Sequence, residues 1–119
     1  MKSAKIPYIA SLEHLTTEQL RQTLKSEGAP LAVACNNWSA DYPYTPAVTA
    51  YLAYTDSHLA LLFCVEESHV KAVALEDNGR VWEDSCVEFF VGNPAGEGYY
   101  NFELNAIGTL LAAYRTSRE

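Results

Sequence analysis

The sequence predicts an all-β fold, an antiparallel β-sandwich of jelly-roll type with one short N-terminal helix. Two stretches, residues 47–65 and 81–108, are rich in aromatic and β-branched residues, and turn-forming residues interrupt each of them. One stretch near the N-terminus has the signals of a helix. At 119 residues, the chain is predicted to form a single domain, 1–119, in which residues 1–30 are an N-terminal extension.

The helix is expected at about residues 17–26. Thr16 can cap it, and Gln19 stands three positions later as the partner in a capping box. Gly28 and Pro30 follow as stop signals. With two or three apolar anchors on one face, this helix is expected to be peripheral and to cover one edge of the sandwich.

Four strands are expected outside the central hairpin, which is described below. Residues 31–38 alternate weakly and predict a first strand, at whose end Trp38 is expected to lie in the core. Residues 47–55 and 59–65 flank a short polar turn and predict a hairpin. Residues 66–78 fit either a strand or a helical turn, and a last strand is expected at 109–114.

The central stretch combines two strands that carry polar residues at alternate positions. Residues 85–91 and 99–106 are joined by a loop rich in Gly, Asn and Pro, which predicts an antiparallel hairpin. Because side chains alternate along a strand, the second strand should have an apolar and a polar face. The polar face comprises Tyr99, Asn101, Glu103 and Asn105. Amides and carboxylates in mid-strand, with Trp82 at the entrance, suit the binding of a polar ligand.

These residues also resemble a known family. The run W-E-D-S-C-V-E-F-F at 82–90, followed by Y-N-F-E at 100–103 and N-A-I-G at 105–108, is similar to carbohydrate-binding module family 9. The resemblance extends back to about Trp38 and covers roughly two-thirds of the chain. It implies a β-sandwich in which Trp82 stacks on a sugar ring and Glu88 hydrogen-bonds to sugar hydroxyls. Family domains are longer, and their second stacking aromatic lies in a C-terminal part that this chain lacks.

Each of these two residues has a structural alternative. A carboxylate in mid-strand is costly to bury unpaired, so Glu88 should face water, a ligand or a basic partner such as Arg80 or Arg115. Trp82 either presents its flat indole to a sugar ring or closes the end of the core. The residues alone leave both alternatives open, and the resemblance favours ligand contact for Glu88.

Acidic residues gather around the central motif, namely Glu66, Glu67, Asp77, Glu83 and Asp84. They follow no calcium-loop pattern, although the resemblance implies that a structural calcium ion is one alternative. No other cofactor is expected. Glu88 and Glu103 could lie on adjacent strands, as the two carboxylates of a glycosidase would. No nucleophile or metal-histidine motif accompanies them, so an enzyme is not expected.

Composition limits the partners. The net charge of −7 argues against nucleic acid and anionic membranes, which favour basic surfaces. No stretch reaches the length of a membrane span. The N-terminus lacks the apolar core of a signal peptide, which predicts a cytoplasmic protein if the start is native and an exported one if a signal was replaced. Three cysteines without ligand spacing are expected to be buried thiols.

The expected function is therefore non-catalytic binding of carbohydrate. The candidate ligand-binding residues are Trp82, Glu88, Tyr99, Asn101, Glu103 and Asn105. The alternative is an interaction or assembly module of the same fold that does not bind sugar. The strands expected from the family beyond Tyr114 are absent, so an unpaired sheet edge is predicted, and with it a homo-oligomer that pairs through this edge.

Overall fold

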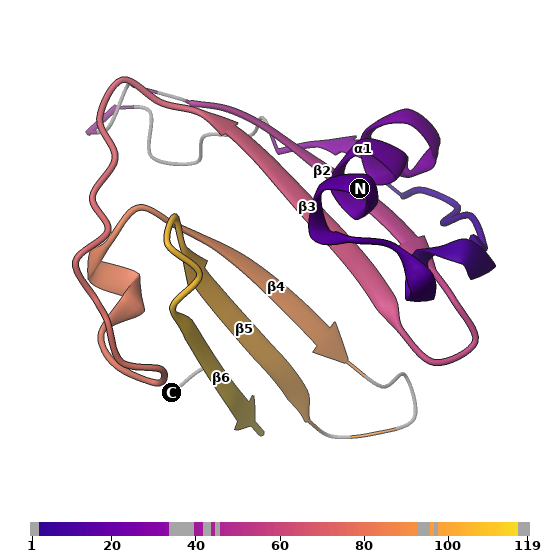
Figure 1. Ribbon diagram of the computed structural model, residues 1–119. Helices are drawn as coiled ribbons and strands as arrows, with labels where there is room; N and C mark the ends of the chain where they lie inside the picture. The colour runs from indigo at the N-terminus through magenta and orange to yellow at the C-terminus, as the bar shows by residue number, and fades with distance from the viewer. Residues whose placement is uncertain are drawn as a thin grey trace. The chain divides into compact units, whose positions relative to one another are not determined.

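The computed structural model describes residues 3–33, 40–41, 44, 46–92, 96 and 98–116. It divides into two compact units, Met1–Ser68 and His69–Glu119. Each unit contains a three-stranded antiparallel sheet, and one α-helix lies in the first (Figure 1). The predictions of an all-β antiparallel fold and of a single short helix are confirmed. The prediction of one domain over 1–119 stays a prediction.

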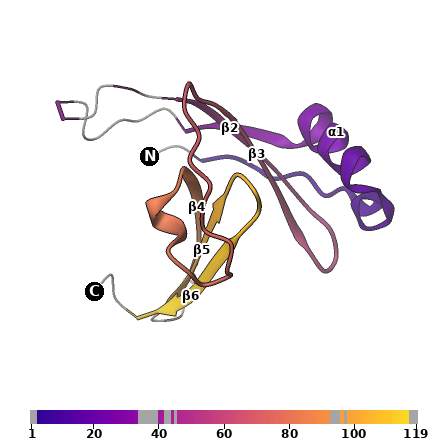
Figure 2. The ribbon, with the colours of Figure 1, turned by 60° about the vertical axis from the view of Figure 1, so that its left-hand side comes forward.

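The first unit holds the 3-10 helix η1 (Ala10–His14), the helix α1 (Thr17–Glu27) and the strands β1 (Ala29–Ala32), β2 (Ala47–Tyr54) and β3 (Leu59–Glu66). The sheet order is β1-β2-β3. Figure 2 shows α1 beside β2 and β3. A small apolar core of Leu12, Leu24 and Ala53 joins η1, α1 and β2.

Helix α1 begins where the capping box predicts. The backbone amide of Gln19 donates to Thr16 Oγ1 at 3.2 Å, and the Thr16 amide donates to Gln19 Oε1 at 3.0 Å. The helix ends at Gly28, whose amide donates to the Leu24 carbonyl. Pro30 then lies in β1, an outer strand of this sheet, where a missing N–H is tolerated.

The hairpin of the first unit also agrees with the prediction. β2 and β3 pair in register from Ala47↔Glu66 to Tyr54↔Leu59, around the predicted polar turn. Glu13, on η1, accepts hydrogen bonds from the Thr55 and Ser57 hydroxyls and contacts His58 Nδ1 at 3.0 Å. These bonds hold η1, for which the sequence has no clear signal, against the hairpin turn.

The first strand is shorter than expected. Residues 31–38 were predicted to form it, whereas β1 occupies Ala29–Ala32 and pairs with β2 from Ala29↔Leu52 to Ala32↔Thr49. Val33 follows β1 outside the strand, and residues 34–38, Trp38 included, lie outside the described residues.

The second unit holds the 3-10 helix η2 (Val81–Glu83) and the strands β4 (Cys86–Gly92), β5 (Tyr99–Asn105) and β6 (Leu110–Arg115), in the order β4-β5-β6. The predicted hairpin is β4–β5, in register from Cys86↔Asn105 to Gly92↔Tyr99. Residues 66–78 are predicted to form either a strand or a helical turn, but only Glu66 lies in a strand, at the end of β3, and residues 67–78 form neither. No helix in the described part of the chain has the length and apolar character needed to cross a membrane.

Candidate functional site

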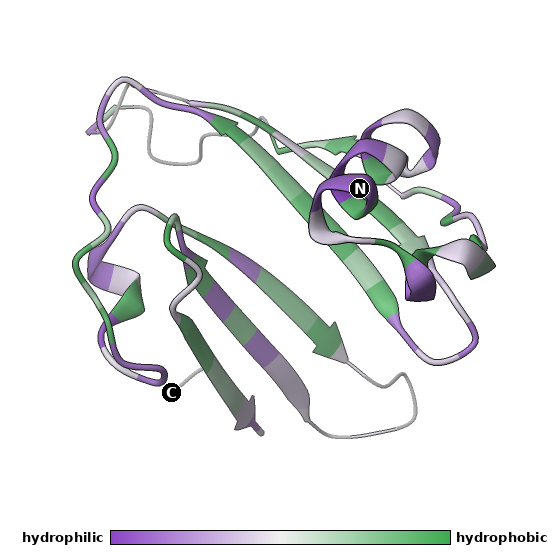
Figure 3. Ribbon diagram, in the orientation of Figure 1, coloured by the Kyte–Doolittle hydropathy of each residue, from purple (hydrophilic) through white to green (hydrophobic). Residues whose placement is uncertain are grey.

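The candidate site is built on one face of the β4–β5–β6 sheet. β5 alternates as predicted, and the alternation is visible as bands of hydrophilic and hydrophobic residues along the strand (Figure 3). The polar face is the more buried one, since Asn101 is 4% exposed and Glu103 7% exposed, whereas Tyr100 on the other face is 52% exposed. Buried polar groups need hydrogen-bonding partners, so their surroundings determine what this face can do.

Glu88 and Glu103 lie directly opposite each other across β4 and β5. Opposite residues in an antiparallel pair point to the same side of the sheet and are near neighbours. Glu88 is exposed and Glu103 is buried. A hydrogen bond to Glu88, followed by burial, raises the pKa of Glu103 to about 7, and the charge of Arg115 opposes the rise. Two carboxyl groups can form a hydrogen bond only when one of them carries a proton.

Three further side chains surround this pair. Cys86, on the same face of β4, has its pKa raised to about 11 by burial and by the charges of Glu103 and Glu88, so it stays a thiol. Arg115 lies opposite Tyr99 on β6. The Tyr99 ring is tilted against the Phe90 ring, with 5.8 Å between the centroids. The face therefore combines carboxyl, amide and aromatic groups with one guanidinium.

Two atoms of this face lack hydrogen-bond partners within the described residues, namely Asn101 Nδ2 and Glu103 Oε2. Both are buried and belong to alternate positions of one strand. An unmatched donor and an unmatched carboxyl oxygen side by side are complementary to a molecule that both donates and accepts, such as water or a hydroxyl group. These atoms are the unsatisfied hydrogen-bonding capacity of the face, and neither of them is exposed to solvent.

Asn105, the last residue of the same strand, differs from Asn101 because its side chain has hydrogen-bond partners. Its Nδ2 donates to the Ala74 carbonyl at 3.1 Å and to Asp84 Oδ2 at 3.0 Å. Its Oδ1 accepts from the amides of Ile107 and Thr109 at 3.2 and 2.9 Å. The Asn105 side chain is thus occupied by internal bonds that shape the β5–β6 turn.

Asp84 is the centre of this internal network. Asp84 Oδ2 also accepts from the backbone amides of Val73 and Ala74, at 3.0 and 2.9 Å. The bonds from Ala74 and Asn105 hold the pKa of Asp84 below its ordinary value. Asp84 therefore ties the irregular segment 69–78 to the β4–β5 hairpin.

Trp82 lies on η2, which packs against β4 and β5. Its side chain is 55% exposed, whereas its neighbour Val81 is fully buried. Of its two alternatives, an indole that closes the core and an indole that faces outward, the exposure agrees with the second.

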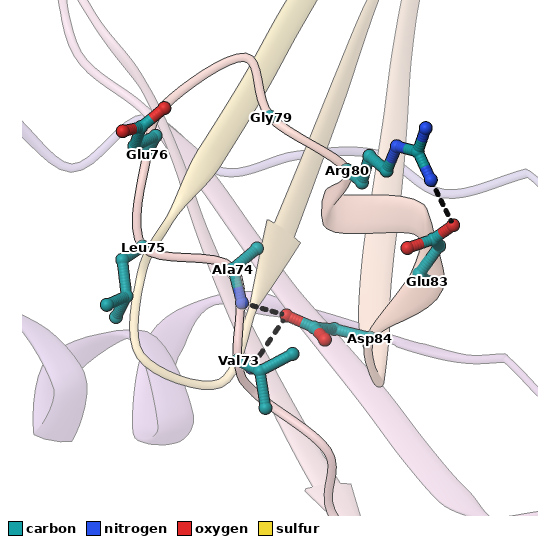
Figure 4. A pocket seen from close by; sticks show the side chains of 8 residues that line it. All are labelled: Val73, Ala74, Leu75, Glu76, Gly79, Arg80, Glu83 and Asp84. Atoms are coloured by element: carbon teal, nitrogen blue, oxygen red, sulfur yellow. Dashed lines mark hydrogen bonds and ion pairs between the residues drawn. The ribbon is translucent and has the colours of Figure 1, made fainter.

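A hollow of about 320 Å³ lies beside η2, between residues 73–76 and residues 79–84 (Figure 4). Arg80 and Glu83 form an ion pair of 3.3 Å at its border, and Asp84 contributes its carboxylate. The volume is at the lower end of small-molecule sites. Trp82, Glu88 and Glu103 do not line this hollow.

The alternative of a structural calcium ion stays a prediction. Calcium requires six to eight oxygen ligands, mostly from carboxylates and carbonyls. Within the described ranges, no three Asp, Glu, His or Cys side chains come together in a way that could hold a metal ion. Asp84, the most buried of the acidic group, receives N–H donors on one oxygen instead.

Sequence reasoning missed or misjudged two features of the candidate site. In the sequence, Asp84 belongs to the family run at 82–90 and to the acidic group but is given no role of its own, although its position two residues after Trp82 could have indicated a role in holding that residue. Arg115 is predicted only as a partner for Glu88, whereas it acts on the charge of Glu103. The structure brings Glu88, Asn101 and Glu103 to one face and places Trp82 on a neighbouring element.

Comparisons with known proteins show the family of this chain. The sequence profile of carbohydrate-binding family 9 matches residues 18–119. The crystal structure of a candidate carbohydrate-binding protein from Bacteroides uniformis is similar, with a TM-score of 0.83 and 36% sequence identity. The similarity covers 96% of this chain and 52% of that one, so the chain spans about half the length of this relative. A comparison with curated proteins gave no match. The profile match over most of the sequence shows that this chain belongs to carbohydrate-binding family 9.

Proposed function

We propose that the chain binds carbohydrate without cleaving it, on the polar face of β4 and β5 and with Trp82 as the aromatic platform. The observation that carries the proposal is the pair of unmatched atoms, Asn101 Nδ2 and Glu103 Oε2, on the face that also holds Glu88. Vicinal sugar hydroxyls donate and accept at neighbouring positions, which is what this donor and acceptor require.

The six candidate residues have different parts in this proposal. Trp82 stacks on the apolar face of a sugar ring, since its indole is exposed on a short, packed helix. Glu88, Asn101 and Glu103 hydrogen-bond to hydroxyls. Tyr99 contributes its hydroxyl and ring edge from the first position of β5. Asn105 supports the site from within, because its amide is already occupied.

The carboxyl pair supports binding rather than hydrolysis. A glycosidase keeps its two carboxyl groups about 5–9.5 Å apart, on either side of the bond that is cleaved. Glu88 and Glu103 are instead direct cross-strand partners on one face of the sheet, so they lie side by side rather than on either side of a bond. The raised pKa of Glu103 is explained by this contact and needs no catalytic role.

The proposal is tested by calorimetric titration of glucose, xylose, cellobiose and xylobiose into the protein and into the Asn101→Ala variant. We expect saturable binding by the unsubstituted protein and a loss of about tenfold or more in the variant, the scale of a hydrogen bond to a charged or buried partner. Thr116→Ala, a change at an exposed residue beyond β6, is a matched control that should bind normally. Absence of binding to every sugar in a glycan array would refute the proposal.

A second candidate function, an interaction or assembly module, is favoured by the opposite face of the same sheet. Tyr100 and Tyr114 are 52% and 58% exposed there and pack on each other, with ring centroids 5.1 Å apart, and Phe102 stacks on Tyr100. A contiguous exposed aromatic patch is typical of protein contact surfaces. In this function a second copy of the chain covers the patch, or pairs with a strand edge.

The outer edge of β6 is partly covered from within its own unit. The Leu110 amide donates to Asp77 Oδ1 at 3.0 Å, and the Ala112 amide donates to Asn78 Oδ1 at 2.9 Å. Edge pairing through β6 is thus confined to its end, near Tyr114. Sedimentation across a dilution series distinguishes the two functions, because the assembly module requires a concentration-dependent oligomer and Tyr114→Ser should dissociate it.

A further inference from the structure

The cross-strand carboxyl pair has a consequence for the class of sugar that the site accepts. We propose that Glu88 and Glu103 share one proton. Neutral sugars bind while the two carboxyl groups keep this proton, and sugars that bear an amino group bind by displacing the proton. This inference rests on the proposed function and specifies the ligand class and the pH dependence of the same site.

The geometry of the strands forces the two carboxyl groups together. Glu88 and Glu103 are direct partners in the β4–β5 register, and like charges in opposite positions destabilise a sheet. Neither strand can turn its glutamate to the other face without a one-residue slip, which would reverse every other side chain as well. A shared proton removes the repulsion and converts it into a hydrogen bond.

Burial makes the doubly ionised state costly. Glu103 is 7% exposed, and its Oε2 has no donor among the described residues. A buried carboxylate without donors is disfavoured, whereas a protonated carboxyl group needs less compensation. Asn101 Nδ2, also unmatched, lies two positions away on the same strand face and is a donor for whatever this pair binds.

The other charged and titratable groups near Glu103 do not replace the proton. On β4 this group is Cys86, besides Glu88 of the pair itself, and Cys86 stays a neutral thiol. On β6 it is Arg115, whose charge lowers the pKa of Glu103 but leaves it at about 7. On β5 itself, Tyr99 is the next titratable group on this face. Near η2, Asp84 acts on Cys86 and has backbone donors of its own.

The proton balance differs between the two ligand classes. A neutral sugar offers hydroxyls to a pair that carries one proton before and after binding, so no proton is exchanged. An ammonium group brings its own positive charge and donates to both carboxylates, so the pair releases one proton to solvent. Affinity for an amino sugar should then rise with pH up to about 7, by up to tenfold per pH unit, while affinity for the neutral analogue stays level.

The experiment compares glucosamine oligosaccharides with their N-acetylated counterparts by calorimetry at pH 5, 6 and 7, each in two buffers of different ionisation enthalpy. We expect about one proton released on binding of the amino sugar at pH 6, and none with the neutral one. Glu103→Gln should abolish the proton release and the pH slope. Glu76→Gln, a change to an exposed carboxylate outside the pair, should preserve both.

The outcomes separate this inference from the proposed function. If neutral sugars bind and the amino sugar shows neither proton release nor a pH slope, the carboxyl-pair inference is overturned and the proposed function stands. If no sugar of either class binds, the proposed function fails, and the inference about ligands fails with it. Carbon NMR of the glutamate carboxyl groups gives a readout without ligand, in which titration of Glu103 at an ordinary pKa would overturn the shared proton.

Discussion

Replacement of Asn105 by alanine should destabilise the second unit strongly, although sequence reasoning placed this residue in the ligand site. The substitution removes four hydrogen bonds, two from Nδ2 and two to Oδ1, from a side chain that is 6% exposed. One of them goes to the Asp84 carboxylate. The substitution also removes a hydrogen-bond partner from three backbone groups, the Ile107 and Thr109 amides and the Ala74 carbonyl.

The magnitude follows from these bonds. A hydrogen bond to a charged group contributes about 1.5–3 kcal/mol, and a neutral one about 0.5–1.5 kcal/mol. Water can enter and replace some of the neutral bonds near the β5–β6 turn. We therefore expect a loss of about 3–4 kcal/mol in unfolding free energy. At a urea slope of roughly 2 kcal/mol per molar, the midpoint falls by roughly 1.5–2 M.

The assay is urea unfolding followed by circular dichroism, together with sugar titration of the folded variant. Asn101→Ala is the matched control, since it removes a buried amide from the same strand face whose Nδ2 has no partner among the described residues. It should cost much less stability and much more affinity than Asn105→Ala. A stability loss under about 1 kcal/mol for Asn105→Ala, with sugar binding abolished, would refute the structural role of this side chain.

Three other substitutions test single elements. Trp82→Ala should abolish sugar binding and leave the unfolding midpoint nearly unchanged, because the indole is exposed, and a loss of about 3–5 kcal/mol would place it in the core instead. Glu103→Gln should gain stability relative to the unsubstituted protein as pH rises from 5 to 8. The pKa of Glu103 is raised from 4.5 to about 7, so its contribution to folding stability is complete below pH 4.5 and is lost as pH rises through 7. This loss is on the order of 3 kcal/mol. Equal pH profiles of stability for the two proteins would contradict it. Glu13→Gln should lower the melting temperature at pH 7 but not near pH 2. Hydrogen bonds from Ser57, Thr55 and His58 lower the pKa of Glu13 to about 2. The contribution of Glu13 to folding stability is therefore present above pH 4.5 and lost as pH falls to about 2. A difference in melting temperature that persists near pH 2 would contradict this.

The elements that could be predicted from sequence are those whose determinants are local. The capping box at Thr16 and Gln19 fixes the start of α1 within four residues, and the polar turn after Tyr54 fixes the β2–β3 hairpin. The alternation along β5 fixes which residues share a face. In each case the partners lie within a few positions of one another or on consecutive strands.

The features that could not be predicted depend on distant partners. Residues 69–78 have no regular structure because their amides bond to Asp84 and Ser85, ten or more positions away. η1 depends on Leu12 in the apolar core and on Glu13 at the hairpin turn. Alternation also cannot show whether a polar side chain on a strand face is open or already satisfied, which is the difference between Asn101 and Asn105.

The difference between Asn101 and Asn105 suggests that the two parts of the strand have different roles. Trp82 stands between fully buried Val81 and Asp84, whose carboxylate is fixed by Asn105 and by two backbone amides. These contacts fix the backbone on either side of Trp82, and in the proposed function this lowers the entropic cost of stacking. In the proposed function, the satisfied end of the polar strand therefore holds the aromatic platform, and the unsatisfied middle, at Asn101 and Glu103, recognises the sugar that stacks on it.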